Sequence, residues 1–288
     1  MLLLIGWAVV MGSVVGGFLF NGGNFMGLYH PGELGIVTGI MIGFVLGSSP
    51  PSLLKLMLSQ IKRAVGKSAF PAERYIDLTK ALYELFMIAR EQGVVGIEEH
   101  VLSPNTSPVF AKYQSFINDH HAVGFLQDAL RPLIEGRMKP EQLRSALNED
   151  IERIRHHSYQ PLIVLNKVAD ALPGVGIVAA VLGIVVTMQF ISGEKALIGE
   201  KVAAALTGTF FGLLFSYGII QPMIIKIELQ NEDEVNYYQV MCNMIVSYAT
   251  GAPPIMAAEA GRRSIPTDRQ PTSEVLESTL KTIKRGQG

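Results

Sequence analysis

Four stretches of the chain are apolar enough to cross a lipid bilayer. Each lacks Asp, Glu, Lys and Arg throughout, and they are Leu2–Phe20, Leu34–Leu54, Ala171–Gly193 and Val202–Ile225. Because about 20 apolar residues span the hydrocarbon core of a bilayer, the pattern predicts four transmembrane helices. The second helix is expected to end early, where two serines and two prolines occupy residues 48–51. The first has no basic segment and no small-residue cleavage site, so we expect a retained helix and not a signal peptide.

The segment between the second and third spans has helical periodicity. Gly93 follows a series of apolar residues spaced three or four apart, at Tyr75, Leu78, Leu82, Leu85 and Ala89. This spacing predicts an amphipathic helix that Gly93 ends. Two further helical patterns flank Gly136, and no useful alternation of apolar and polar residues indicates a strand. We therefore predict an all-α, polytopic membrane protein with four transmembrane helices and a helical cytoplasmic domain between the second and third.

The chain divides into four expected segments. Residues 1–50 hold the first two transmembrane helices, 51–170 the cytoplasmic helical domain, 171–227 the third and fourth transmembrane helices, and 228–288 a cytoplasmic C-terminal helix and tail. Within the last segment we expect one helix to about Tyr248, a break at "GAPP", a short helix from Ile255 and a polar, mobile end.

Charge sets the expected orientation. Only 17% of the residues are charged, and the net charge of −1 argues against a nucleic-acid binder. The segment from Pro50 to Asp170 holds 15 of the 24 Lys and Arg residues, and the chain after Ile225 holds 7 more. Basic residues favour the cytoplasmic side, so both termini and the middle segment are predicted to be cytoplasmic and both short connectors to face outward.

Small residues form one face on each of the last two spans. The third span has Pro173, Gly176, Ala180, Gly183 and Thr187 at spacings of three and four, and the fourth has Ala205, Thr209, Gly212 and Ser216. Small faces indicate close helix–helix approach in lipid. Two alternatives are open: the two faces pack on each other within one subunit, or they line a groove that receives a helix from another chain.

The four spans contain no ionisable acid or base, although ion translocators usually hold one at membrane depth. A hydroxyl does not titrate as a proton carrier near pH 7. Any acid would therefore come from a partner helix. Pro173 and Pro222 each remove a backbone hydrogen bond and can bend a helix where it meets the cytoplasmic side.

Four motifs together resemble the MotA family of flagellar-motor stator subunits: "GGFLFNGG", "ALPGVGIVAAVLG", "GTFFGLLFSYGIIQP" and "GAPPIMAAEAGRR". The resemblance covers nearly the whole chain. It implies a pentamer in the bacterial inner membrane, surrounding a pair of MotB subunits whose single transmembrane helix carries an essential aspartate. It also implies that the ring turns around its partner as ions pass, which generates torque on the rotor.

The resemblance also suggests roles for single residues. Pro173 and Pro222 match prolines that couple ion flow to movement. Arg90 and Glu98 match a charged pair that engages the rotor protein FliG, and Asp150 matches an acidic residue of lesser effect. Sodium-driven relatives tend to have a threonine where Ala180 stands here and another at the position of Thr209. Since alanine offers no oxygen to a dehydrated sodium ion, proton coupling is favoured.

On the groove alternative, the partner's helix would contact Gly176, Gly183, Thr187, Ala205, Gly212 and Ser216. The main rival function is an ExbB- or TolQ-like energiser of outer-membrane processes, although such chains usually have three spans. A membrane enzyme with a metal at His120–His121 or His156–His157 is disfavoured, because adjacent histidines are usually surface residues. A self-contained transporter is disfavoured by the uncharged spans. We expect no cofactor, no metal and no enzymatic activity.

Overall fold

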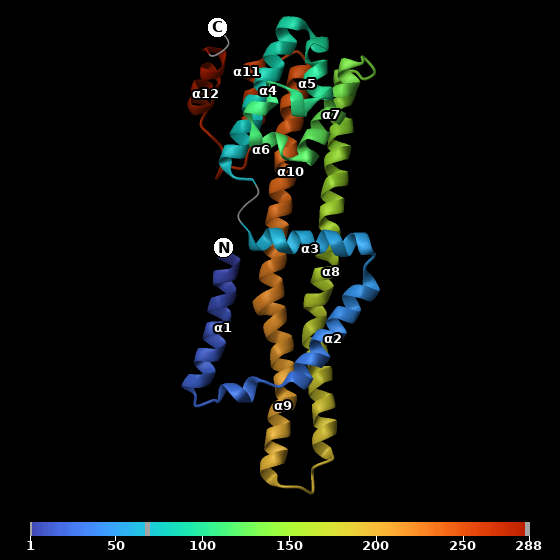
Figure 1. Ribbon diagram of the computed structural model, residues 1–288, viewed down its shortest axis with the longest axis vertical. Coiled ribbons are helices and arrows are strands. Elements are labelled where there is room, and N and C mark those ends of the chain that lie inside the picture. The colour runs from blue at the N-terminus through green and yellow to red at the C-terminus, as the bar shows by residue number, and fades with distance from the viewer. Residues whose placement is uncertain (1, 67–69, 286–288) are drawn as a thin grey trace. The chain divides into compact units, whose positions relative to one another are not determined.

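The computed structural model describes residues 2–66 and 70–285, and within them it divides into two compact units. Residues 2–66 and 158–230 form one unit, called here the membrane unit, and residues 70–157 and 231–285 form the other, the head unit. Both units consist of helices that are joined by turns and loops (Figure 1). The all-α prediction is therefore confirmed.

Among the described residues, every helix long and apolar enough to cross a membrane lies wholly or partly in the membrane unit. Its elements are α1 (Leu2–Phe20), η1 (Phe25–Leu28), α2 (Pro31–Ser48), α3 (Pro51–Val65), the second part of α8 (Pro140–Met188), α9 (Lys195–Leu213), the π-helix η5 (Leu214–Ile220) and the first part of α10 (Gln221–Ala249). The candidate spans are α1, α2, α8 and the continuous run from α9 into α10. The second span ends at Ser48, as predicted, because Pro50 is extended and Pro51 begins a new helix.

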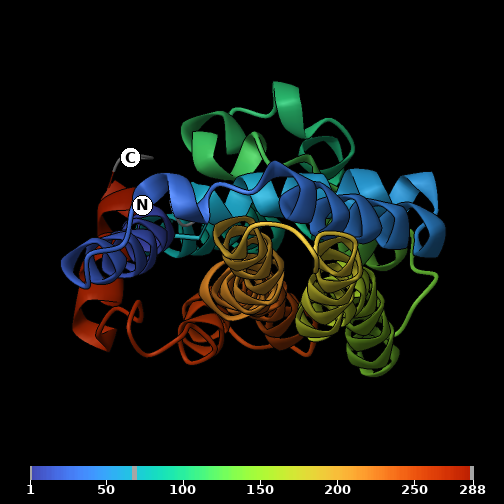
Figure 2. The same ribbon diagram turned by 90° about the horizontal axis from the view of Figure 1, so that it is seen from below.

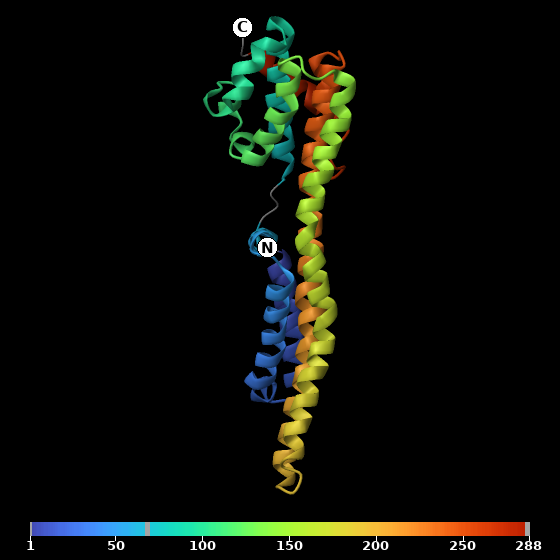
Figure 3. The ribbon, with the colours of Figure 1, turned by 90° about the vertical axis from the view of Figure 1, so that its right-hand side faces the viewer.

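Within the membrane unit, α8 and α9 lie side by side, and Figure 2 looks along both helices and shows the loop that joins them. Helices α1 and α2 both lie on one side of this pair (Figure 3). Val37 and Met41 of α2 are buried against Leu172 and Ala179 of α8. Helix α1 packs more loosely, so most of its apolar surface faces outward.

Helix α3 lies across α8 and α10 (Figure 1). It buries Met57, Gln60 and Ala64 at helical spacing against apolar residues of both helices, and it leaves Lys55 and Lys62 exposed. An amphipathic helix with exposed lysines suits a membrane surface. The structure thus groups α3 with the spans, although the sequence places residues 51–170 in one segment. The fourfold division of the chain remains a prediction.

The head unit is a cluster of shorter helices together with the ends of two long ones. Its elements are α4 (Ala72–Gln92), η2 (Val94–Ile97), α5 (Glu98–Leu102), η3 (Pro104–Thr106), η4 (Phe110–Lys112), α6 (Gln114–Ile117), α7 (His120–Ile134), the first part of α8, the second part of α10, α11 (Pro254–Arg262) and α12 (Ser273–Arg285). Gly93 ends α4 with φ +78°, a value that favours glycine. The predicted apolar face of α4 is fully confirmed as core: Tyr75, Leu78, Leu82, Leu85 and Ala89 are all buried.

The prediction of a mobile end of the chain is wrong for residues up to 285. After α10 ends at Ala249, α11 and then α12 follow, and α12 runs from Ser273 to Arg285. Leu276 and Leu280 are buried in the head core, and Ile283 packs beside them. The surrounding polar residues obscure this apolar stripe in the sequence, but its four- and three-residue spacing places it on one helical face.

Candidate functional site

The contact between α8 and α9 is made largely by backbone. A Cβ atom built on Gly212 would lie 2.6 Å from the Leu172 carbonyl oxygen, and one built on Gly176 would lie 2.8 Å from the Gly208 carbonyl oxygen. A Cβ on Gly183 would lie 2.7 Å from the Cβ of Ala205. Real Cβ atoms essentially never approach so closely, so glycine allows the two helices to touch.

The small faces of α8 and α9 pack on each other within the chain. Gly176, Gly183, Ala205 and Gly212 face one another across α8 and α9, as the first of the two alternatives expects. No partner helix fits into that contact. A groove for a partner would have to use the outer faces, where α8 exposes Ile177, Val181, Ile184, Val185 and Met188. The groove itself remains a prediction.

The hydroxyl groups of these spans differ in how firmly they are bonded. Thr187 Oγ1 donates to the Gly183 carbonyl at 2.8 Å, and Ser216 Oγ donates to the Ala169 carbonyl at 2.7 Å. Both side chains are buried. Thr209 is only half-buried, and its Oγ1 lies 3.4 Å from the Gly176 carbonyl oxygen, which is a long hydrogen bond. Of these three hydroxyls, that of Thr209 is therefore the most available to another group.

Ala180 lies opposite Gly208 across the helix pair, and Thr209 lies opposite Gly176, one helical turn before Ala180. A Cβ atom built on Gly208 would lie 3.3 Å from the Ala180 backbone nitrogen, and Thr209 is the next residue. Ala180 is buried. The two residues proposed from the sequence to govern ion choice therefore lie within about one helical turn of each other along the contact between α8 and α9, and the side chain of Ala180 offers only a methyl group.

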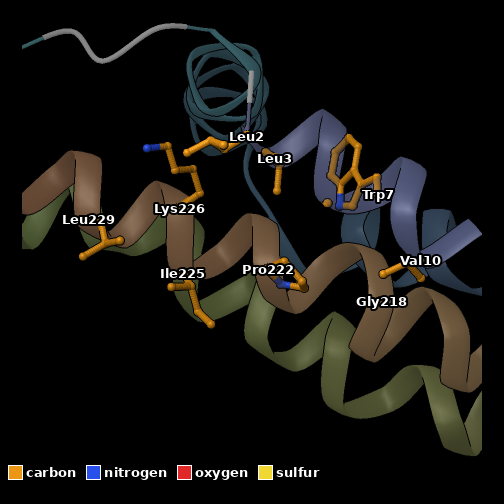
Figure 4. A pocket seen from close by; sticks show the side chains of 10 residues that line it. Leu2, Leu3, Trp7, Val10, Gly218, Pro222, Ile225, Lys226 and Leu229 are labelled. Carbon is orange, nitrogen blue, oxygen red and sulfur yellow. The ribbon is translucent and has the colours of Figure 1, made fainter.

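Pro222 directly follows the region where the fourth span changes its helical form. The π-helix η5 directly precedes α10, and the Gln221 N–H donates to the Ser216 carbonyl five residues earlier. A cavity of about 320 Å³ lies between α1 and this region, with Trp7, Val10, Gly218 and Pro222 among its lining residues (Figure 4). The sequence prediction missed both the π-helix and Trp7. The signals present were the proline within an apolar run and the single tryptophan of the chain.

The predicted rotor-binding residues lie in the head unit. Arg90 lies in the last turn of α4 and Glu98 begins α5, and both are exposed. Within residues 2–66 and 70–285, neither forms an ion pair. Val94 and Val95, in the η2 turn between them, are 40% and 68% exposed. The sequence prediction missed this apolar pair.

Asp150 has a different environment. It lies on α8, partly buried, and its Oδ1 is 2.8 Å from a guanidinium nitrogen of Arg153. Near the end of α4, Tyr248 stacks on Phe86 with ring centroids 4.4 Å apart. Burial raises the pKa of Tyr248, and the positive charge of Arg90 opposes this shift. Of the three predicted rotor-binding residues, Asp150 thus forms an ion pair within the described residues, whereas Arg90 and Glu98 form none.

No group of three or more His, Cys, Asp or Glu residues in the described part of the chain could hold a metal ion. His120 and His121 begin α7, where the Asp119 carboxylate accepts hydrogen bonds from the His121 and Ala122 backbone N–H groups. This is ordinary helix capping.

Two families match separate parts of the chain. The one described as "Motility protein A N-terminal" matches residues 4–93, and the one described as "MotA/TolQ/ExbB proton channel family" matches residues 118–240. Chemotaxis protein LafT of Vibrio parahaemolyticus is 33% identical over 276 residues, which cover 96% of this chain and 97% of LafT. Motility protein A of Escherichia coli K12 is 32% identical over 288 residues, which cover 100% of this chain and 97% of the relative.

The fold also matches a solved structure. The MotAB structure from C. jejuni superposes with a TM-score of 0.75 at 20% sequence identity, covering 92% of this chain and 96% of that one. At this level of identity the likeness concerns the fold, and it extends over both units of the chain.

Proposed function

This chain belongs to the MotA family of flagellar-motor stator subunits, and from this premise we propose how it works: with a MotB-like partner it forms a proton channel whose ion flow drives the rotor. The observation that carries the proposal is the uncharged character of all four spans. A proton path needs a titratable group at membrane depth, and this chain supplies only hydroxyls there. The acid is therefore an aspartate on the partner's transmembrane helix.

Proton coupling is supported by the pair of Ala180 and Thr209. Sodium requires several oxygen ligands in a tight shell, whereas a proton needs an acid and a chain of water molecules. Ala180 contributes no side-chain oxygen, and the hydroxyl of Thr209 is only weakly bonded within the chain. We assign to Thr209 the ordering of water or of the partner's carboxyl group.

Pro173 and Pro222 convert ion flow into movement in this proposal. Pro173 lies inside α8, and Pro222 follows the π-helix at the start of α10. Each interrupts the regular ladder of backbone hydrogen bonds, so each helix bends more easily there than elsewhere. Both α8 and α10 continue from the membrane unit into the head unit, which gives the movement a covalent route.

The head unit carries the proposed contact with the rotor protein FliG. Arg90 and Glu98 are exposed and unpaired by salt bridges within the described residues, which suits a rapid, repeated electrostatic contact. The exposed Val94 and Val95 would add a small apolar area between the two charges. Asp150, which Arg153 partly neutralises, has the weaker claim.

The assembly follows from the same premise. We propose a homo-pentamer in the bacterial inner membrane, with lipid around it and both termini and the head unit in the cytoplasm. The unpartnered apolar faces of α1 and α8 are consistent with neighbouring subunits, a partner helix and lipid around each chain. The ExbB/TolQ alternative is disfavoured, because the similarity to motility protein A runs over the full length and includes its N-terminal family.

The test is motility in a flagellated host that lacks stators and receives this chain with its MotB-like partner. Sodium concentration is varied at fixed pH, and a proton uncoupler is added in parallel. We expect swimming speed to ignore sodium and to collapse with the uncoupler. Speed that follows sodium would overturn the ion assignment alone. No motility, with both proteins present in the membrane, would contradict the stator proposal.

A further inference from the structure

Within the described part of the membrane unit, three prolines interrupt helices: Pro161 and Pro173 in α8, and Pro222 in α10. A proline has no N–H to donate to the carbonyl four residues earlier, and its ring pushes that turn open. A carbonyl left without a donor in an apolar environment is costly. In membrane helices, side chains of neighbouring segments often replace the missing donor.

At Pro173 a side chain from another element makes such a replacement, and near Pro161 and Pro222 a side chain bonds to the neighbouring carbonyl, three residues before the proline. Ser216 Oγ donates at 2.7 Å to the carbonyl of Ala169, which stands four residues before Pro173. Trp7 Nε1 donates at 3.1 Å to the carbonyl of Ile219, three residues before Pro222. Gln60 Nε2 of α3 donates at 2.8 Å to the carbonyl of Ser158, three residues before Pro161.

Ser216 differs from the other two donors because its backbone also forms a hydrogen bond next to a second proline, Pro222. It lies within η5, and its own carbonyl accepts the N–H of Gln221, the residue before Pro222. The hydroxyl of Ser216 is buried and reaches across to α8. One residue therefore hydrogen-bonds at the Pro173 interruption with its side chain and at the Pro222 interruption with its backbone.

We propose that Ser216 is a positioning residue that couples the two prolines, so that bending at Pro173 and rearrangement of the π-helix before Pro222 occur together. This inference rests on the proposed function, in which both prolines transmit movement. When α8 bends at Pro173, the Ala169 carbonyl moves and draws the Ser216 hydroxyl with it. Since Ser216 also accepts the Gln221 N–H, η5 must adjust in the same step.

The first experiment compares swimming speed in the stator-less host for S216A, S216T and the control T207A. Thr207 is also a buried hydroxyl residue of the fourth span, but its Oγ1 donates to Ala204 of its own helix, at 2.7 Å. Losing one buried hydrogen bond shifts an equilibrium by roughly fivefold, so we expect S216A to swim at about half speed or less. S216T, which keeps the hydroxyl, should swim faster than S216A, and T207A should match wild type. All variants are compared at equal membrane levels.

The second experiment measures the thermal midpoint of the purified complex with the MotB-like partner, in a cycle of S216A and P173A. The P173A variant gains a backbone N–H that can donate to the Ala169 carbonyl, so the Ser216 hydroxyl is no longer required there. We expect S216A to lower the midpoint in the wild-type background and to lower it much less in P173A. Additive effects, or S216A swimming at wild-type speed, would overturn the coupling. If the wild-type chain fails to support motility, the proposed function fails, while the thermal cycle still tests the hydrogen bond.

Discussion

At the scale of the residue, glycine sets how closely the two central spans approach. Gly212 lies opposite Leu172 and Gly176, and a Cβ atom on Gly212 would stand 2.6 Å from a backbone oxygen and 3.0 Å from a backbone carbon. The opposing atoms belong to main chain, so no side chain can rotate away. Helix α8 would have to move as a whole.

Replacing Gly212 by alanine should therefore separate α8 from α9. We expect a loss of about 1–3 kcal/mol of stability and of most motility, because the added methyl group overfills the contact. Gly199→Ala is the matched control in α9, since a Cβ at Gly199 meets no atom within 4 Å. The thermal midpoint of the complex and swimming speed check the prediction, and equal results for the two variants would contradict it.

Glu259 provides a pH-dependent residue in the head unit. Its carboxylate accepts hydrogen bonds from Arg262 at 2.7 Å and from Arg263 at 3.0 Å, which holds its pKa at about 2, below the ordinary value of 4.5. Because the folded pKa is the lower one, the stabilisation is present above about pH 4.5 and is lost as pH falls toward 2.

Glu259→Gln should thus cost about 1–3 kcal/mol at pH 7. The difference in thermal midpoint between wild type and Glu259→Gln should shrink as the pH is lowered from 4.5 toward 2. Unfolding of the purified protein followed by circular dichroism at several pH values measures this. A difference that stays constant over that window would show that the charge of Glu259 is not responsible.

At the scale of the element, α12 is held by a narrow apolar stripe. Leu280 is 1% exposed, so Leu280→Ala should destabilise the protein by about 2–3 kcal/mol through lost burial and the cavity left behind. Val275 of the same helix is 49% exposed, and Val275→Ala should change stability by less than about 0.5 kcal/mol. Thermal unfolding of both variants distinguishes a packed α12 from a mobile end.

The elements also show what the sequence can and cannot predict. The four spans and the buried face of α4 follow from composition and periodicity, which are local properties. The packing of α12 depends on an apolar surface supplied by α4, far away in the chain. The π-helix depends on how α10 restarts at Pro222, and the placement of α3 depends on the apolar faces of α8 and α10. The packing of α12, the π-helix and the placement of α3 therefore cannot be predicted from the residues of each segment alone.

In the candidate site, too, local sequence patterns could be predicted, whereas contacts between distant segments could not. The spacing of small residues indicated a close helix contact, but it does not determine whether the contacting helix belongs to the same chain or to another one. The structure shows Gly176 and Gly212 meeting within the chain. The hydrogen bond from Ser216 to the Ala169 carbonyl could not be predicted, because it depends on the register between two helices and joins residues 47 apart in sequence.

At the scale of the whole molecule, torque requires both the channel and the rotor contact. Arg90→Ala and Glu98→Ala should each reduce swimming strongly while the complex still assembles and conducts protons, because both side chains are exposed and support no packing. Arg137→Ala is the control, since Arg137 is an exposed arginine of the head unit whose partner is Glu135. Swimming speed and proton flux in vesicles are measured together. Loss of flux in Arg90→Ala would place its defect in the channel and contradict a rotor role.

The glycine contact between α8 and α9 also has a consequence for genetics. An oversized residue in a core is usually rescued by a smaller one opposite it, but Gly176 has no side chain to shorten, and Leu172 presents its carbonyl oxygen. A strain carrying Gly212→Ala therefore has no compensating mutation available in the contact. Selection for restored swimming should return glycine at position 212 itself, or changes elsewhere that let the two helices move apart.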